Sequence, residues 1–292
     1  MKPHQLSSLT DTQVLDVRLD DDYEAEHIAG SKNNCVFEVA FVHRLAESAP
    51  DKSKVTIVYG ADGESAEAAA AADKLTRQGY SDVRILEGGL KAAREAGVDI
   101  ITGQSLPDPF PAPDGRFEID LEESRLEWLG RNLINKHWGT AAIESGHLDF
   151  SHGQVTGGEF VIDLTKLECA DLAGTDMHDV LIDHLRNDDF FDVERHPKAS
   201  LVIEDVQAEG NTSPGSQNIK VKGNLTLRGQ THPIEFPVAA GLTEEGKPAA
   251  QAAFSIDRTR WGILYGSGKF FNRLAGHVVN DMLEFQIRII AK

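Results

Sequence analysis

The feature that most constrains this fold is a run of alternating prolines near the middle of the chain. The segment TGQSLPDPFPAPDG places them at Pro107, Pro109, Pro111 and Pro113. Proline lacks a backbone N–H and pushes the residue before it toward extended conformations, which disfavours both a helix and a central strand. We therefore predict a semi-rigid linker over residues 102–114 that separates two domains, 1–101 and 115–292.

The two sides of this linker have different hydrophobic periods. Before it, short apolar runs such as VTIVY and VRILEG alternate with helical segments such as LKAAREAG. This order is typical of a parallel sheet with crossover helices. After it, apolar and polar residues alternate with a period of two, as in IKVKGNLTL and MLEFQIRII. The second pattern predicts an antiparallel barrel or sandwich with apolar side chains inside.

In the second half, the alternation assigns particular side chains to the inner face. The predicted inward set includes Phe160, Ile162, Leu164, Ile219, Val221, Gly223, Leu225, Leu227, Leu283, Phe285, Ile287 and Ile289. The intervening residues, such as Lys220 and Lys222, are predicted to face solvent.

Charge and composition exclude several classes of protein. The formal net charge of -18 repels nucleic-acid phosphates and disfavours docking on anionic membranes. No run reaches the roughly 18 apolar residues of a membrane-spanning helix. The first residues, MKPHQLSSLTDTQ, lack the apolar core of a signal peptide, so we expect a cytoplasmic protein. Cys35 and Cys169 fit no metal or redox spacing and are expected to be structural thiols.

The N-terminal motifs VLDVRLDDDYEAEHIAGS and GYSDVRILEGGLKAAREAG resemble those of the rhodanese domain. The matching positions are Asp16, Arg18, His27, Gly30, Gly88 and Gly89. The resemblance implies an α/β domain with a parallel sheet. It also implies a catalytic cysteine directly after the strand VTIVY, held in a cradle of backbone amides that favours a thiolate.

Gly60 occupies the position where the resemblance implies that cysteine. Asp62 and Glu64 follow it, and two carboxylates would repel thiosulfate or a persulfide anion. Ser65 is expected to cap the Ala-rich helix rather than act as a nucleophile, since no base is paired with it. We therefore expect no catalytic residue here. The domain is interpreted as a non-catalytic interaction or regulatory module, through which a protein partner could bind.

The second half resembles the YceI-like family of polyisoprenoid-binding proteins. The motifs that carry this resemblance are RLEWLGRNLINKHWGTAAIESGHLDF, GGEFVIDLTKLE, LIDHLRNDDFFDVERHPKASLVI, VKGNLTLRGQTHPIEFPV and FSIDRTRWGILYGSG. It implies a lipocalin-like, eight-stranded antiparallel barrel that holds a long isoprenoid chain in its lumen. Eight strands enclose an interior that side chains can just fill or that holds one ligand.

Large aromatic side chains are the candidate ligand contacts. The candidates are Trp128, Trp138, Phe160, Phe190, Phe191, Phe236, Phe254, Trp261, Phe270 and Phe271. Adjacent aromatics are expected to face different sides, so that one of Phe190–Phe191 and one of Phe270–Phe271 would seal the barrel mouth. Core packing is the alternative for each residue.

Two helices are expected near this mouth. GTDMHDVLIDHLRNDDFF reads as a helix that buries Val180, Leu181, His184 and Leu185, and GKFFNRLAG as a second, shorter one. Histidines such as His137, His147 and His178 invite a metal hypothesis, but none shows the two-histidine spacing of a zinc helix, and we expect no metal.

The sequence thus favours non-catalytic binding of an amphipathic lipid, such as an isoprenoid or a quinone. Two alternatives stay open. One is an enzyme related to the sulfurtransferases, which the missing cysteine opposes. The other is a partner-binding protein whose barrel is filled by its own side chains. The sequence leaves open whether the protein forms a homodimer.

Overall fold

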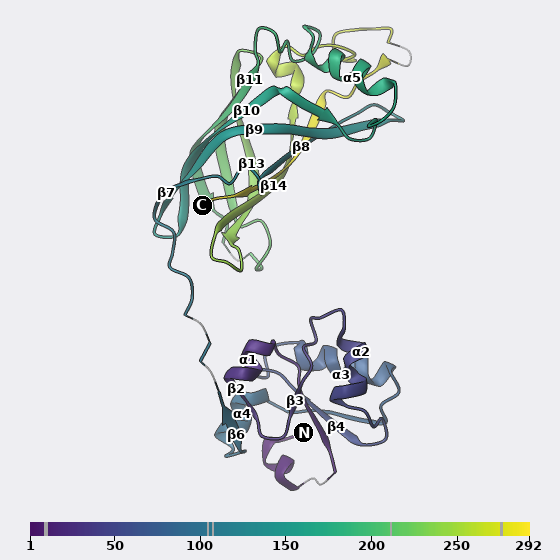
Figure 1. Cartoon of the computed structure of the whole chain (residues 1–292), viewed down its shortest axis with the longest axis vertical. Helices are drawn as coiled ribbons and strands as arrows, with labels where there is room; N and C mark the ends of the chain where they lie inside the picture. Colours follow the sequence, from purple (N-terminus) through teal and green to yellow (C-terminus); the bar gives the residue numbers. More distant parts are fainter. Residues whose placement is uncertain (9–10, 104, 107, 211, 275–276) are drawn as a thin grey trace. The chain divides into compact units, whose positions relative to one another are not determined.

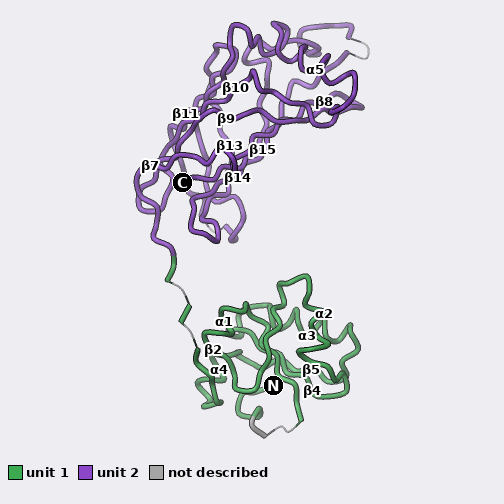
Figure 2. The backbone as a smooth tube through the Cα atoms, in the orientation of Figure 1, with its two compact units in different colours: residues 1–109 green, residues 110–292 purple. Residues whose placement is uncertain are grey.

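The computed structural model describes residues 1–8, 11–103, 105–106, 108–210, 212–274 and 277–292. The chain divides into two compact units, Met1–Pro109 and Phe110–Lys292 (Figure 2). The division falls within the predicted linker, of which residues 104 and 107 lie outside the described part. Thr102, which we assigned to the linker, instead ends a strand, because it pairs with Glu26.

Unit 1 is built on a four-stranded parallel sheet with the order β3-β1-β4-β5. Its strands are β1 (Gln13–Asp16), β3 (Lys32–Asn33), β4 (Val55–Tyr59) and β5 (Asp82–Ile85). A separate antiparallel pair joins β2 (Glu26–Ile28) and β6 (Ile100–Thr102). β4 is central and rich in β-branched residues, as expected for a strand that is buried on both faces.

Helices cover both faces of this sheet. They are η1 (Pro3–Ser8), α1 (Asp20–Ala25), α2 (Phe41–Ser48), α3 (Glu67–Arg77) and α4 (Gly89–Glu95). Phe41 of α2 and Leu75 of α3 pack in one core cluster with Val58, while Leu90 of α4 packs in another with Ile57. Successive residues of β4 therefore point into opposite layers, which confirms the predicted α/β arrangement.

Unit 2 is a closed antiparallel barrel (Figure 1). Its strands are β8 (Arg125–Arg131), β9 (Lys136–Ser151), β10 (Gln154–Cys169), β11 (Lys198–Ala208), β12 (Ile219–Leu227), β13 (Gln230–Leu242), β14 (Pro248–Asp257) and β15 (Met282–Ile290). Neighbouring strands pair in chain order, and β15 returns to β8. Among the described residues these eight strands close the barrel, as predicted, and β7 (Gly115–Glu118) adds to β9 outside the circle.

The barrel interior follows from the two-residue period of its strands. Val221, Leu283 and Ile289 are buried, as the sequence predicts. The alternate residues form ion pairs outside, such as Lys220 of β12 with Glu235 of β13. Side chains from all eight strands therefore meet in one apolar cluster.

The predicted helix after β10 is present as α5 (Met177–Arg186), but it buries a partly different face. Leu185 is buried as expected, whereas Val180 is 57 % exposed and Ile182 is buried instead. The predicted second helix is absent from residues 268–274, which form a turn followed by irregular backbone. Its last two residues, 275–276, lie outside the described part. A short 3-10 helix, η2 (Arg258–Trp261), follows β14.

Candidate functional site

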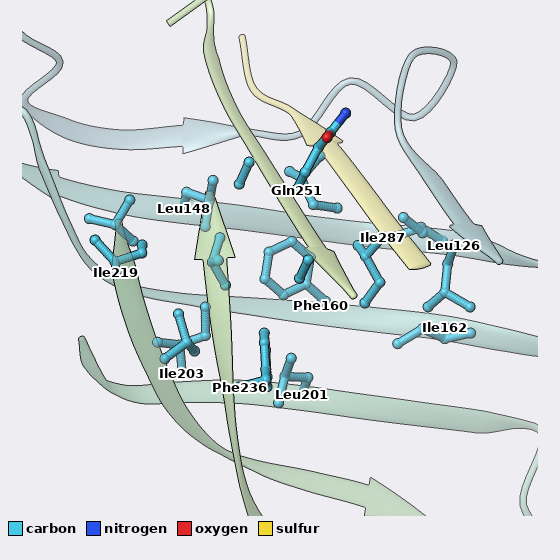
Figure 3. Close-up of a pocket in the computed structure, with 17 residues that line it drawn as sticks. Leu126, Leu148, Phe160, Ile162, Leu201, Ile203, Ile219, Phe236, Gln251 and Ile287 are labelled. Atoms are coloured by element: carbon cyan, nitrogen blue, oxygen red, sulfur yellow. The ribbon is translucent and has the colours of Figure 1, made fainter. Parts of the chain in front are cut away.

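The lumen of unit 2 contains a cavity lined by hydrocarbon side chains (Figure 3). Its volume is about 80 Å³. The lining is Leu126, Ile143, Leu148, Val155, Phe160, Ile162, Leu201, Ile203, Ile219, Val221, Phe236, Val238, Ala250, Gln251, Ala252, Ile287 and Ile289. In this list Gln251 is the residue with a polar side chain, and it is exposed. We call this cavity chamber 1.

A second cavity, chamber 2, lies in the same lumen and also measures about 80 Å³. Its wall is wholly apolar and includes Trp128, Leu164, Phe191, Leu227 and Phe254. Four residues line both chambers: Leu126, Ile162, Leu201 and Ile287. They form a waist between two parts of one apolar bore, since each of them touches both cavities.

Aromatic rings connect the two chambers. Phe236 lines chamber 1 and Phe254 lines chamber 2, and their rings stack with centroids 4.1 Å apart at 14°. Phe285 continues the series, 5.6 Å from Phe254. Stacked rings of this kind pack tightly without fixing their neighbours by hydrogen bonds. The contact between Phe236 and Phe254 therefore joins the wall of chamber 1 to the wall of chamber 2.

Five of the ten predicted aromatic candidates line the chambers. Phe160 and Phe236 border chamber 1, and Trp128, Phe191 and Phe254 border chamber 2. Trp261 is fully buried outside both linings, and its indole N–H donates to the Leu225 carbonyl at 3.1 Å.

The expectation for the two phenylalanine pairs was wrong. Phe190 and Phe191 are both buried, and Phe270 and Phe271 are both exposed. Neither pair lies in a strand, so the alternation of a strand does not apply to them. Trp138 is also exposed, at 41 %, on the outer side of β9.

Arg258 organises the end of the barrel next to η2. Its buried guanidinium donates to the carbonyls of Ile263 at 2.7 Å, Tyr265 at 2.7 Å and Asn280 at 3.0 Å. It also lies over the Phe190 ring, 5.4 Å from the centroid. Burial lowers the pKa of this group. Its main partners are therefore backbone carbonyls, and through them Arg258 holds the segment after η2.

In unit 1, the loop between β4 and α3 forms hydrogen bonds with its own acidic side chains. The Ala61 amide donates to Glu67 Oε1 at 2.6 Å, and the amides of Glu64 and Ser65 donate to Asp62 Oδ1 at 2.9 and 3.2 Å. A Cβ atom at Gly60 would lie 2.0 Å from Glu67 Oε1. The Glu67 carboxylate therefore occupies the space beside Gly60. The prediction that Ser65 caps α3 was wrong, because Ala66 is the N-cap and forms no side-chain cap hydrogen bond. Ser65 lies one residue earlier, and its hydroxyl accepts from the Glu67 amide at 3.3 Å.

The model of the YceI-like domain matches residues 117–291. The chain belongs to the YceI-like family. The model of the rhodanese-like domain matches residues 3–96, so a rhodanese-like domain precedes the YceI-like domain. Both resemblances read from the sequence are thus confirmed. No curated protein matches the chain.

Solved structures resemble each part of this YceI-like protein separately. BcnA of Burkholderia cenocepacia shares 16% identity, covers 60% of this chain over 99% of its own length, and has a TM-score of 0.44. A polyisoprenoid-binding domain from Saccharophagus degradans, implicated in plant cell wall breakdown, shares 15% identity over 60% of this chain and 97% of its own, with a TM-score of 0.44. A rhodanese-like domain from an Anabaena protein shares 32% identity over 31% of this chain and 98% of its own, with a TM-score of 0.28.

The sequence reasoning missed two parts of these sites. It selected aromatic residues as the ligand contacts of the YceI-like barrel, whereas the waist is aliphatic. Ile162 and Ile287 were already in the predicted inward set, so the alternation of the strands could have identified them. It also overlooked Glu67 in the first turn of α3, where an acidic side chain that reaches back to a preceding amide is a common way to begin a helix.

Among the described residues, no helix has the length and apolar character needed to cross a bilayer.

Proposed function

We propose that the YceI-like barrel binds the apolar chain of an amphipathic lipid, with a long isoprenoid or a quinone tail as the preferred class. The observation that supports this most is the pair of apolar chambers in one bore. Neither wall exposes polar surface to the cavity. Such a cavity stays dry and favours hydrocarbon, and each buried CH₂ group contributes about 0.8 kcal/mol.

The size of the chambers sets a condition on the ligand. At about 80 Å³ each, neither chamber alone holds a long chain. We propose that a chain enters by displacing the Phe236–Phe254 stack, which joins the walls of the two chambers, so that both chambers and the waist form one channel. A linear, flexible chain suits this path, because it can follow a narrow bore one segment at a time. A rigid polycyclic lipid does not.

Native mass spectrometry and organic extraction of the freshly purified full chain test this proposal. The expected result is a co-purifying lipid, or one-to-one binding of an added isoprenoid. An unbranched alkane chain is added in a parallel experiment as a comparison. Protein that purifies free of lipid and also takes up no added chain would favour a filled barrel and contradict the proposal.

We propose further that the rhodanese-like unit does not transfer sulfur and serves as an interaction module. The Glu67 carboxylate supports this, because it occupies the space that a side chain at position 60 would need, and its negative charge would repel a substrate anion. Cys35, the cysteine of this unit, is buried at 1 % exposure. Exposed Phe37 and Val39 give the unit an apolar surface for a protein partner.

Incubation of the full chain with thiosulfate and cyanide checks this second proposal. We expect no thiocyanate above the level of a protein-free control. Turnover above that level, lost on substitution of Cys35 by serine, would identify a working thiol and overturn the proposal.

A further inference from the structure

Three different metal-binding side chains meet where strands β9 and β10 begin and end. His137 is the second residue of β9, Cys169 is the last residue of β10, and Asp171 follows in the turn toward α5. One ligand atom from each of them lies within 4.8 Å of the others. The register of the two strands produces this meeting, since Cys169 pairs with Gly139 and the Ala170 amide donates to the Trp138 carbonyl at 2.8 Å.

Asp171 contacts both of the other side chains, His137 and Cys169. One carboxylate oxygen lies 2.9 Å from His137 Nδ1. The other accepts from the Trp138 amide at 2.8 Å and from Cys169 Sγ at 3.3 Å. The histidine and the thiol therefore point toward the same carboxylate, and both come from strands of a closed barrel, which limits their movement.

We propose that His137, Cys169 and Asp171 form a Zn²⁺ site. Nitrogen, sulfur and carboxylate oxygen are the ligands that zinc takes in proteins, at about 2.0–2.3 Å. Two ligands of a tetrahedral zinc at these lengths lie roughly 3.4 Å apart. The observed separations of 2.9 and 3.3 Å, each to a different oxygen of Asp171, are close to this value. All three ligand atoms lie within 4.8 Å of one another, so side-chain rotations can bring them around one ion.

The surroundings give the metal one open position. Cys169 is buried at 2 % exposure, whereas the His137 side chain is 41 % exposed. Zinc would therefore bind at the surface side of the cluster, with a water molecule as the fourth ligand. On binding, the Cys169 thiol releases its proton to solvent and Sγ becomes the anionic ligand. This inference uses residues outside both chambers, so it stands independently of the proposed lipid binding.

The test uses the full chain and Co²⁺ as a spectroscopic probe for zinc. We expect Co²⁺ to bind one-to-one with a thiolate-to-metal charge-transfer band, and Zn²⁺ to displace it. Cys169→Ser removes the band, while Cys35→Ser, the matched control in the other unit, retains it. His137→Gln and Asp171→Asn weaken Zn²⁺ binding by at least about tenfold.

His137→Gln keeps the test informative if Cys169→Ser fails to fold, because the His137 side chain is partly exposed. Zn²⁺ should raise the unfolding temperature of the unsubstituted chain by mass action and should raise that of His137→Gln less. Absence of the band in the unsubstituted chain, or equal Zn²⁺ affinity in the chain and in His137→Gln, would overturn the proposal.

Discussion

At the scale of single residues, Arg258 connects the end of the barrel to the segment that follows η2. Its exposure is 1 %, and its guanidinium donates to carbonyls of residues 263, 265, 279 and 280. A buried carbonyl that loses its hydrogen-bond donor is left without a partner in either protein or water, which destabilises the folded state. One side chain therefore stabilises a stretch of backbone without regular secondary structure.

Arg258→Met is expected to lower the free energy of unfolding of the barrel by about 3 kcal/mol or more, because it leaves several buried carbonyls without donors. Urea titration followed by circular dichroism measures this. Arg260→Met is the matched control, since Arg260 is exposed, donates to the Pro233 carbonyl and lies over the Trp261 ring. It should cost less than about 1 kcal/mol. Equal losses in the two variants would contradict the role given to Arg258.

A second residue-level prediction concerns the loop of the rhodanese-like unit. Gly60→Ala brings a Cβ against the Glu67 side chain, which must leave and give up its hydrogen bond with the Ala61 amide. We expect a loss of about 1 kcal/mol in unfolding free energy. In a Glu67→Ala background the same substitution should cost clearly less. A double-mutant cycle measures the difference, and costs that add within about 0.5 kcal/mol would show that the two positions do not interact.

At the scale of elements, the strands were predictable because their period of two persists along each of them. Ile162, Val221 and Ile287 lie inside the barrel as the alternation requires. The same reasoning failed for the turns, where Phe190 and Phe191 are buried together. It also missed the cluster of His137 with Cys169, since their approach depends on strand register, which no local spacing reveals.

The lumen-facing side of β14 provides a prediction for ligand capacity. Ala252 lines chamber 1, and Ala252→Leu adds hydrocarbon there, whereas Ala253 is exposed on the outer side of the same strand. Filling an apolar cavity should keep or slightly raise the unfolding free energy, by up to about 1 kcal/mol. It should also weaken binding of an isoprenoid chain by roughly tenfold, because about two CH₂ groups of the ligand can no longer be buried in chamber 1.

Ala253→Leu is the control for this prediction and should leave binding unchanged. Titration with a fluorescent isoprenoid analogue, together with urea unfolding of each variant, measures both quantities. Equal affinities for the Ala252 and Ala253 variants would place the ligand outside chamber 1.

At the scale of the whole molecule, each unit has its own apolar core, and the prolines between them disfavour regular structure. We propose that the two units unfold independently. Unit 1 differs from the barrel in having a fully buried tyrosine, Tyr59, whose hydroxyl accepts from the Ile28 amide at 3.0 Å and lies 2.9 Å from Ser31 Oγ. This difference gives a means of separating the two transitions.

Burial of Tyr59 raises the pKa of its phenol above the usual value near 10, and the nearby Asp16 carboxylate raises it further. Below pH 10 the phenol is neutral in the folded and unfolded states, so its full contribution to stability is present. Above pH 10 the unfolded chain loses the proton while the folded unit retains it. The unfolding free energy of unit 1 should therefore fall by about 1.4 kcal/mol for each further pH unit.

Thermal unfolding of the full chain between about pH 9 and pH 11 tests this expectation, with Tyr59→Phe as the comparison. The variant starts less stable, because it lacks the hydroxyl and its hydrogen bonds, but its transition should move less with pH. Tyr23 and Tyr80 also have raised pKa values caused mainly by burial. In Tyr59→Phe, the fall in stability of unit 1 with pH therefore becomes smaller but does not disappear. If the two units unfold independently, one transition shows this dependence on Tyr59 and the other does not. A single transition that shifts equally in both proteins would contradict both the buried phenol and the independence of the units.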